Sequence, residues 1–450
     1  MRMWFNSKYV NNGDIFLVNE KNKKYVKDAI KNKASKIVTE LDEEFNIKTE
    51  KTDDIIKYFY DYYYDKIKDL KLIGITGTNG KTTTCYLIYQ MLNMQGIKTS
   101  YIGTIGYYVD DTKVTLDNTT PSMDVIYNLL LDSSIYGCKY TVMEVSSHAL
   151  KQNRLYGLLF DAIGVTNITM DHLDYHKTMN DYINSKKKIV NMLRNKKICI
   201  LNKKDKYYKE FINDKNNNHI IGKDIKIKKI INRLDKTILY IKENKNITRF
   251  NLSLIGKFNC YNYLMAYEIV KTLGYMNEEI INNSYLLKEP PGRMQLIKYN
   301  TNSIFVDYAH TPDAVLNVLK TVNKIKNKGI ITIIGCGGNR DSGKRPIMAK
   351  VACKNSSYVI FTNDNPRYED EQLIMNDILK GAKDNYEVIY DRRSAIRKGI
   401  SLLNKNMVLL ILGKGHESYQ IIGDTKYDFS DYEEVKKVIK KYWNANERLI

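Results

Sequence analysis

The chain has 450 residues, of which 43% are hydrophobic, and it carries a formal net charge of +20. This length suits two or three domains with cores of their own, and no apolar run reaches the roughly 18 residues that a membrane helix requires. The first residues lack an apolar core followed by a cleavage site, and the six cysteines form no CxxC pair, so we expect a cytoplasmic protein with reduced thiols and without a signal peptide.

The excess of basic residues raises the question of a nucleic-acid partner. The 71 lysines and arginines are spread from end to end, among Asn, Ile and Tyr, and no recognised nucleic-acid-binding motif accompanies them. A drift of composition gives such a charge without a binding face. We therefore expect no nucleic acid as a partner, whereas small polyanionic substrates would be attracted by the positive field.

In chain order, residues 1–70 predict a small mixed α/β unit with strands over 13–20 and 35–40, a helix over 24–34 and a long helix or linker over 52–70. Alternating strands and helices then continue to about residue 285, which is typical of α/β proteins with a mostly parallel sheet. The basic, Asn-rich residues 202–250 predict peripheral strands and turns.

The pair Pro290–Pro291 ends this region, because two prolines cannot continue a helix. Four strand-to-loop units follow it, in the segments SIFVDYAHTP, GIITIIGCGGNRDSGKRP, SYVIFTNDNPR and NMVLLILGKGHE. Each places polar residues directly after a strand. Because the carboxyl ends of parallel strands lie at one edge of a sheet, we expect these residues to line one crevice.

The segment GITGTNGKTTT (74–84) follows a predicted strand and opens a predicted helix. Its backbone amides can surround phosphate oxygens, Lys81 supplies a positive charge and Thr82 can coordinate Mg²⁺. The spacing departs by one residue from the usual GxxxxGK[ST] pattern, since Gly74 stands one position too early. The alternative is a glycine turn before an ordinary helix.

Two further segments carry candidate metal ligands. Glu144, in YTVMEVSSHAL, ends a predicted strand, where its carboxylate either holds Mg²⁺ beside the phosphate loop or caps a helix. Residues 171–176 gather two aspartates and two histidines after another strand. Such a cluster can bind a metal or cap a helix, and the sequence leaves both open.

Ten motifs occur in an order that resembles the Mur ligases, and among them the MurE type: GTNGKTT, NTTP, EVSSHAL, TNITMDHLDYH, GKFNCYNYLMA, PPGRMQ, DYAHTPDA, GCGGNRDSGKRP, DNPR and GKGHE. The resemblance is strong over residues 71–430 and weak before them. It implies an α/β fold of three domains: an abbreviated UDP-sugar-binding domain (1–70), a central ATPase domain with a P-loop (71–288) and a Rossmann-like domain that binds the amino acid (289–450).

The resemblance also implies a reaction. ATP phosphorylates the D-glutamate carboxylate of UDP-N-acetylmuramoyl-L-alanyl-D-glutamate, and an amine then attacks the acyl phosphate, as in the synthesis of peptidoglycan precursors. The implied catalytic residues are Lys81, Glu144, His172 and Lys186. The implied ATP-binding residues are Gly77, Thr78, Asn79, Gly80, Lys81, Thr82, Thr83, Asn262, Arg293 and Asp307.

The resemblance places Mg²⁺ on Thr82, Glu144, His172 and Lys186, with Lys186 carbamylated to N6-carboxylysine. Without the resemblance, the segment SKKK would be interpreted as a solvated helix face. The residues implied to bind the nucleotide-sugar peptide are Ser7, Asn118, Thr119, Thr120, Ser146, Gln152 and Arg154. Arg293 and Asp307 come from the C-terminal domain, so closure of the domains would complete the ATP site.

The incoming amine is predicted from DNPR. Diaminopimelate differs from lysine by one distal carboxylate, which an arginine fork can bind. The family's diaminopimelate signature is intact, and the implied contacts are Arg340, Asp364, Asn365, Arg367, Gly413 and Glu417, of which Glu417 would bind the distal ammonium. The alternative for Arg367 is a surface salt bridge with Glu369 or Asp370. The acidic residues 369–371 themselves read as a solvated helix start.

The chain departs from the family in its first domain, where Asn6 and Lys8 replace the usual Asp and Arg around Ser7, and at Met170. Lysine addition or a specialised second-copy ligase on a variant precursor therefore stays an alternative. Three rival hypotheses are a folate- or cyanophycin-type ligase, a homologue without turnover and a P-loop ATPase stimulated by nucleic acid. We expect a monomer.

Overall fold

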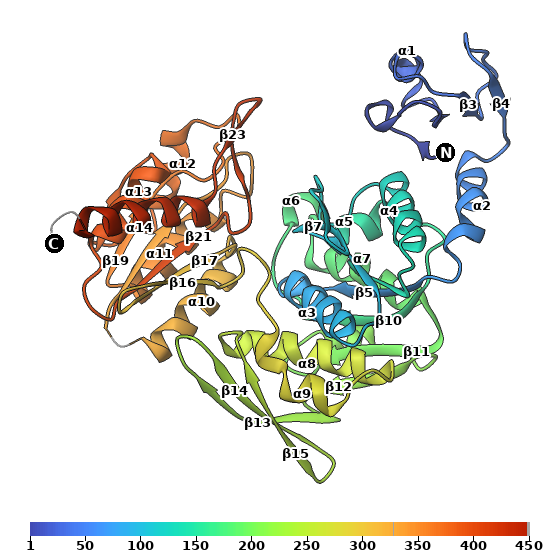
Figure 1. The fold of residues 1–450 in the computed structure, drawn as a ribbon. Helices are drawn as coiled ribbons and strands as arrows, with labels where there is room; N and C mark the ends of the chain where they lie inside the picture. The colour runs from blue at the N-terminus through green and yellow to red at the C-terminus, as the bar shows by residue number, and fades with distance from the viewer. Residues whose placement is uncertain (327, 448–450) are drawn as a thin grey trace.

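The structure is a computed structural model that describes residues 1–326 and 328–447. Its strands form a sheet of four, a mixed sheet of eleven, a sheet of six and a two-stranded hairpin (Figure 1). Within the described part of the chain, no helix is long and apolar enough to cross a membrane. All six cysteines are free, as the sequence predicts.

The first sheet is small and parallel. Its order is β1-β2-β3-β4, with β1 at Met3–Trp4, β2 at Ile15–Val18, β3 at Lys36–Thr39 and β4 at Thr49–Lys51. Helix α1 (Val26–Lys31) follows β2, and α2 (Ile55–Ile67) leads from β4 to the large sheet.

Helix α2 joins the first sheet to the rest of the protein. The side chain of Asp54 caps it by accepting from Lys57 N, and its buried residues recur every four positions, at Ile55, Phe59, Tyr63 and Ile67. Tyr63 accepts a hydrogen bond from the Met3 amide (2.9 Å) and donates to Asn128 (2.7 Å). One hydrophobic core therefore runs from the first sheet into the large one.

The eleven-stranded sheet has the order β15-β14-β13-β12-β11-β10-β5-β9-β6-β7-β8. Its strands are β5 (Lys71–Thr76), β6 (Thr99–Gly103), β7 (Gly106–Val109), β8 (Thr112–Val114), β9 (Tyr140–Glu144), β10 (Phe160–Val165), β11 (Leu193–Asn202), β12 (Asn217–Ile221), β13 (Ile225–Asn232), β14 (Thr237–Glu243) and β15 (Asn246–Leu252). The run from β13 through β12, β11, β10, β5 and β9 to β6 is parallel, whereas β14–β15 and β7–β8 add antiparallel pairs at the two ends. The prediction of peripheral strands over 202–250 is confirmed.

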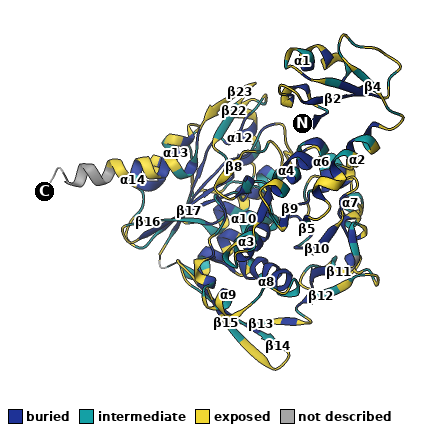
Figure 2. Cartoon of the chain, turned by 45° about the vertical axis from the view of Figure 1, so that its right-hand side comes forward, coloured by how far each residue is buried: buried dark blue, intermediate teal, exposed yellow. Residues whose placement is uncertain are grey.

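Helices cover both faces of the parallel strands, whose residues are mostly buried (Figure 2). They are α3 (Lys81–Met94), α4 (Met123–Ile135), α5 (Ser147–Lys151), α6 (Leu173–His176), α7 (Met179–Asn191), α8 (Lys257–Thr272) and α9 (Glu278–Asn282). Two separate hydrophobic clusters result.

The six-stranded sheet has the order β16-β17-β21-β18-β19-β20, and all its strands except β16 run parallel. They are β16 (Gln295–Tyr299), β17 (Asn302–Asp307), β18 (Ile330–Ile334), β19 (Tyr358–Phe361), β20 (Tyr386–Val388) and β21 (Val408–Leu412). The accompanying helices are α10 (Pro312–Ile325), α11 (Lys344–Asn355), α12 (Glu371–Leu379), α13 (Arg392–Ser401) and α14 (Asp431–Glu447). The hairpin β22–β23 (Tyr419–Ile422, Thr425–Asp428) follows β21.

Candidate active site

The phosphate-type loop lies between β5 and α3, as the sequence predicts. Gly77 and Gly80 have φ values of +140° and +90°, which side chains other than glycine rarely adopt. A Cβ at Gly80 would lie 2.3 Å from Asn262 Oδ1, so the loop also packs tightly on α8. Helix α3 starts at Lys81, and its free amides make its N-terminus an anion site.

The loop and the end of β9 share a polar network. Thr82 Oγ1 donates to Glu144 Oε2 (3.0 Å), and Lys81 Nζ donates to the carbonyls of Gly77 and Thr78 (3.0 and 2.9 Å). The Glu144 side chain is fully buried, and it also accepts from Tyr101 and Thr104. The structure therefore places Glu144 beside the phosphate loop; it does not cap a helix.

A cavity of about 380 Å³ opens over this loop, between the large sheet and the six-stranded sheet. Nine of the ten predicted ATP-binding residues line it, Gly77 being the exception. Those that line it are Thr78, Asn79, Gly80, Lys81, Thr82, Thr83, Asn262, Arg293 and Asp307. The sequence therefore predicts correctly that these residues converge, although they come from three separate regions of the chain.

Arg293 closes the cavity from the C-terminal side. Its Nη2 donates to Thr82 Oγ1 (3.2 Å), and its guanidinium carbon lies 4.5 Å from the centre of the Tyr308 ring. Asp307 accepts from the amides of Met294 (2.6 Å) and Ala309 (2.8 Å). The Asp307 carboxylate therefore fixes the turn that carries Arg293, in addition to bordering the cavity.

A second cavity of about 470 Å³ lies beside the first. All six predicted diaminopimelate contacts line it, together with five of the residues predicted for the nucleotide-sugar peptide: Asn118, Thr119, Thr120, Ser146 and Arg154. Ser7 and Gln152 lie outside both cavities; Gln152 accepts from Arg154 Nε (2.8 Å), and Ser7 is buried in the first sheet's unit. The loops after β17, β18, β19 and β21 all contribute, which confirms the predicted crevice.

The two cavities meet. Five residues border both of them: Thr119, Asp171, His172, Tyr308 and His310. Burial lowers the pKa of His172 to about 4, and burial also lowers the pKa of His310, so both imidazoles are neutral at pH 7. The two cavities therefore meet beside two uncharged rings and the Asp171 carboxylate.

One wall of the second cavity is acidic. Asn365 Nδ2 donates to Glu417 Oε2 (2.8 Å), and the fully buried Lys414 donates to both Glu417 (2.9 Å) and Asn365 Oδ1 (3.0 Å). Burial, together with the nearby Asp364 carboxylate, raises the pKa of Glu417. A cationic group of a ligand would relieve this crowding of acids.

Arg367 stands near this acidic wall and has no carboxylate partner among the described residues. Its Nη1 donates to Gly338 O (2.9 Å) and more weakly to Asn365 O (3.4 Å), which leaves Nε and Nη2 without partners in the described chain. Glu369 instead pairs with Arg345, and Asp370 caps α12. The alternative prediction, a surface salt bridge from Arg367 to Glu369 or Asp370, is therefore wrong. The interpretation of Glu369 as merely solvated is wrong for the same reason.

Comparison with known proteins agrees with this geometry. The family model for the Mur ligase middle domain matches residues 75–270, and the model for the Mur ligase glutamate ligase domain matches residues 292–415. The chain belongs to the Mur ligase family. Two curated UDP-N-acetylmuramoyl-L-alanyl-D-glutamate–2,6-diaminopimelate ligases are similar to it. That of Fusobacterium nucleatum is 40% identical over 92% of this chain and 88% of its own, and that of Bacillus cereus is 39% identical over 86% and 82%.

Solved Mur ligases share the architecture. A structure of a UDP-N-acetylmuramoyl-L-alanyl-D-glutamate–2,6-diaminopimelate ligase matches 98% of the chain with a TM-score of 0.67 and 29% identity, and covers 95% of that protein. MurF of Thermotoga maritima in complex with ADP matches 99% of the chain and 98% of its own length with a TM-score of 0.72, at 16% identity, and supports the fold alone. The predicted α/β Mur ligase fold of the MurE type is confirmed.

In this Mur ligase, Lys186 of α7 lies directly under the phosphate loop. Its side chain is 1% exposed, and its Nζ donates to the Gly77 carbonyl (2.8 Å). Burial, and then the positive charge of Lys81, lower the pKa of Lys186 well below its usual value. The interpretation of SKKK as a solvated face is therefore wrong at Lys186, while Lys187 on the same helix is only partly buried and pairs with Glu210.

Sequence reasoning missed several residues of this Mur ligase site. Tyr101 and Thr104 hold Glu144, Lys414 supports Glu417, and Tyr308 forms the platform for Arg293. Lys414 had a signal, because it lies inside GKGHE, three residues before Glu417. Tyr101 had none, since an aromatic residue in a strand is ordinary core.

Proposed function

We propose that the protein is an ATP-dependent ligase that adds meso-diaminopimelate to UDP-N-acetylmuramoyl-L-alanyl-D-glutamate. The observation that carries the amine assignment is the second cavity, which holds an arginine with unused donors beside two acids, Asp364 and Glu417. The distal end of diaminopimelate presents one carboxylate and one ammonium, which match this pair of charges. Lysine would leave Arg367 unpaired, and such a loss can cost roughly 10⁴ in selectivity.

ATP would occupy the first cavity. The loop amides, Lys81 and Arg293 supply positive charge to the β- and γ-phosphates, and Asn262 packs against the loop. This charge lets the substrate carboxylate approach the γ-phosphate, which it attacks while ADP departs. The product of this first step is an acyl phosphate.

Mg²⁺ fits the donors beside the loop. Thr82 and Glu144 offer hard oxygens 3.0 Å apart, the donor set typical of an ion that is completed by substrate phosphates and water. Among the described residues, no three His, Cys, Asp or Glu side chains gather closely enough to hold a metal by themselves. When bound, Mg²⁺ neutralises the phosphate charge.

Carbamylation of Lys186 is part of the proposal. Burial, which lowers the pKa of Lys186, favours the uncharged amine, the form that adds CO₂ and releases a proton to give a carbamate. Its neighbours are Gly77 and Lys81, so the resulting anion would lie beside a positive charge. The carbamate and His172 would join Thr82 and Glu144 as the predicted ligands of Mg²⁺.

The amide would form where the cavities meet. The incoming ammonium first loses one proton to its surroundings and becomes an amine; the lone pair of the amine then forms the C–N bond, and the C–O bond of the acyl phosphate breaks. Phosphate leaves with the electron pair and takes the second proton from nitrogen. The nucleotide-sugar peptide would run along Asn118, Thr119, Thr120, Ser146 and Arg154.

The role of Ser7 and Gln152 in holding this substrate stays a prediction, as do the domain boundaries, the monomeric state and the cytoplasmic location. Ser7 belongs to the unit whose sequence departs most from the family.

An amine screen tests the function. Purified protein receives ATP, Mg²⁺ and UDP-N-acetylmuramoyl-L-alanyl-D-glutamate, and phosphate release is followed with diaminopimelate, with lysine and without an amine. We expect release that depends on both the nucleotide-sugar peptide and diaminopimelate and stays low with lysine. Equal rates with the two amines would refute the specificity, and release stimulated by DNA or RNA would favour the ATPase alternative.

A further inference from the structure

Two loops carry the arginines of the second cavity, and they lie against each other. The loop after β18 carries Arg340, and the loop after β19 carries Arg367. Gly338 N donates to Asn365 O (2.9 Å), and Arg367 Nη1 donates to Gly338 O (2.9 Å). A Cβ at Gly338 would lie 1.9 Å from the Pro366 carbonyl oxygen, so the contact leaves no room for a side chain there.

Each loop contains a residue in the left-handed region of backbone conformation. Asn339 has a φ of +51°, and Arg367 has a φ of +57°. This conformation is unfavourable for a residue other than glycine, and Asn tolerates it better than Arg. The orientation of the Arg367 guanidinium therefore depends on contacts that keep this turn in place.

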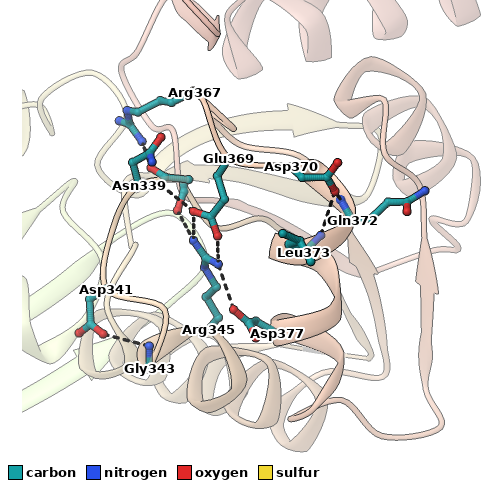
Figure 3. Close-up of polar contacts among 12 residues, drawn as sticks. Asn339, Asp341, Gly343, Arg345, Arg367, Glu369, Asp370, Gln372, Leu373 and Asp377 are labelled. Atoms are coloured by element: carbon teal, nitrogen blue, oxygen red, sulfur yellow. Dashed lines mark hydrogen bonds and ion pairs between the residues drawn. The ribbon is translucent and has the colours of Figure 1, made fainter.

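The carboxylate of Glu369 adds an ionic link between the two loops. It forms a bidentate ion pair with Arg345: Nη1 donates to Oε1 (2.6 Å), and Nη2 donates to Oε2 (2.7 Å). Glu369 Oε2 also accepts a hydrogen bond from the backbone amide of Asn339 (2.7 Å; Figure 3). The Arg345 side chain is 1% exposed, and its Nη2 also approaches the Gly337 carbonyl (3.3 Å). Glu369 belongs to the Arg367 loop, whereas Asn339 and Gly337 belong to the Arg340 loop.

We propose that Glu369 and Arg345 act as a positioning pair that sets amine specificity by holding Arg340 and Arg367 at one spacing. Neither side chain of the pair lines the second cavity, so the effect is indirect. The inference rests on the proposed function, because it assumes that the two arginines bind the incoming diaminopimelate. The proposal explains why Arg367 is surrounded by acids that it does not bind.

The structure offers a matched control. Asp377 of α12 is the second acidic partner of Arg345, at 3.1 Å, and it also pairs with Lys380. Asp377 makes no hydrogen bond to either loop among the described residues (Figure 3). Glu369→Gln and Asp377→Asn therefore each remove one charge from the same guanidinium, but only the first weakens a side-chain link between the loops. The contacts of Gly338 and the bond from Tyr368 N to Asn339 Oδ1 (3.1 Å) stay in place in both variants.

The experiment compares wild type, Glu369→Gln and Asp377→Asn in the same assay. For Glu369→Gln we expect kcat/KM for diaminopimelate to fall roughly 10- to 100-fold, mainly through KM, because a small misplacement of binding groups costs this much. Asp377→Asn should leave kcat/KM unchanged. Phosphate release with hydroxylamine, which traps the acyl phosphate without needing the diaminopimelate contacts, should be unchanged in both variants and shows that they are folded.

A double-mutant cycle shows whether Glu369 acts through Arg367. In an Arg367→Met background, Glu369→Gln should cause a clearly smaller loss of kcat/KM for diaminopimelate than in wild type, because only its effect through Arg340 remains. A full additional loss in that background would overturn the proposal. So would an unchanged KM in Glu369→Gln with only a lower melting temperature, since the pair would then serve stability alone. The wild-type amine screen is independent of these variants, so failure of the diaminopimelate assignment is recognised separately.

Discussion

Arg293 donates a hydrogen bond from Nη2 to the hydroxyl of Thr82, at 3.2 Å, and so connects the turn before the six-stranded sheet with the phosphate loop of the large sheet. The same guanidinium stacks on Tyr308, which borders both cavities. A single side chain therefore contacts the loop proposed to bind phosphate and the platform between the two substrates.

Replacing Arg293 by alanine should impair the ATP step. The charge that it offers to the phosphates is lost, and so is its contact with Thr82, so we expect kcat to fall by roughly 10²- to 10³-fold. Phosphate release under saturating substrates measures the loss, with the exposed Lys298→Ala as control. An Arg293→Lys variant should recover little, because an ammonium cannot reproduce the planar stacking on Tyr308. Full activity of Arg293→Ala would contradict the proposed ATP site.

Lys186 should carry a carbamate. In protein equilibrated with ¹³C-bicarbonate, we expect a carbamate carbon signal that is absent from Lys186→Ala and present in Lys187→Ala, whose side chain points to Glu210. Lys186→Ala should also lose most ligase activity, whether or not bicarbonate is added. Full activity of this variant, or the same carbon signal in it, would count against the modification.

Arg367→Met should change the choice of amine more than the rate of acyl-phosphate formation. Methionine retains volume but offers no donors, so diaminopimelate loses a charge-assisted pair worth roughly 1.5–3 kcal/mol per hydrogen bond. We expect kcat/KM for diaminopimelate to drop by at least about 10-fold, since 1.4 kcal/mol corresponds to that factor. The kcat/KM for lysine should be unchanged. Parallel losses for both amines would show that Arg367 does not read the distal carboxylate.

His416 should make the protein less stable in acid. Burial, followed by the nearby charges of Arg293 and Lys113, lowers the pKa of His416 to about 3, while the unfolded chain keeps a value near 6.5. Between these two values the unfolded state binds a proton that the folded state refuses. The stability contributed by neutral His416 is therefore present above pH 6.5 and is lost as the pH falls from 6.5 toward 3.

Urea unfolding of wild type and His416→Gln over this range tests the sign. The free energy of unfolding of the variant should decline less steeply with falling pH, because glutamine has no proton to take up. Parallel pH profiles would contradict the assignment. His219→Gln is a useful comparison, since His219 lies at a distant site and pairs with Glu268.

The sequence predicts the parallel strands well because both of their faces are covered, so they read as short apolar runs such as LKLIGIT and MVLLIL. It also predicts which residues converge, because polar residues that follow parallel strands must lie at one sheet edge. It does not reveal that Glu369 pairs with Arg345. These residues are 24 positions apart and on different elements, and each reads as a surface charge in its own helix or loop.

The sequence pattern also does not predict the short strands β1, β16 and β20 or the hairpin β22–β23. The hairpin matters for the site, since Ile421 O accepts from Arg367 N (3.0 Å) and Gly423 N donates to Arg367 O (2.8 Å). Polar and apolar residues alternate only weakly in the hairpin segment, and many of its residues are exposed. Its position depends on contacts with the Arg367 loop, which is distant in the sequence, so the local sequence pattern does not predict it.

The most direct test of the central claim is a competition between the two amines. Wild-type protein receives ATP, Mg²⁺, UDP-N-acetylmuramoyl-L-alanyl-D-glutamate and equal concentrations of meso-diaminopimelate and lysine, and mass spectrometry measures the two nucleotide-linked tripeptides. The account predicts that the diaminopimelate product exceeds the lysine product by roughly 10³- to 10⁴-fold. Comparable amounts of the two products, or a majority of the lysine product, would contradict it.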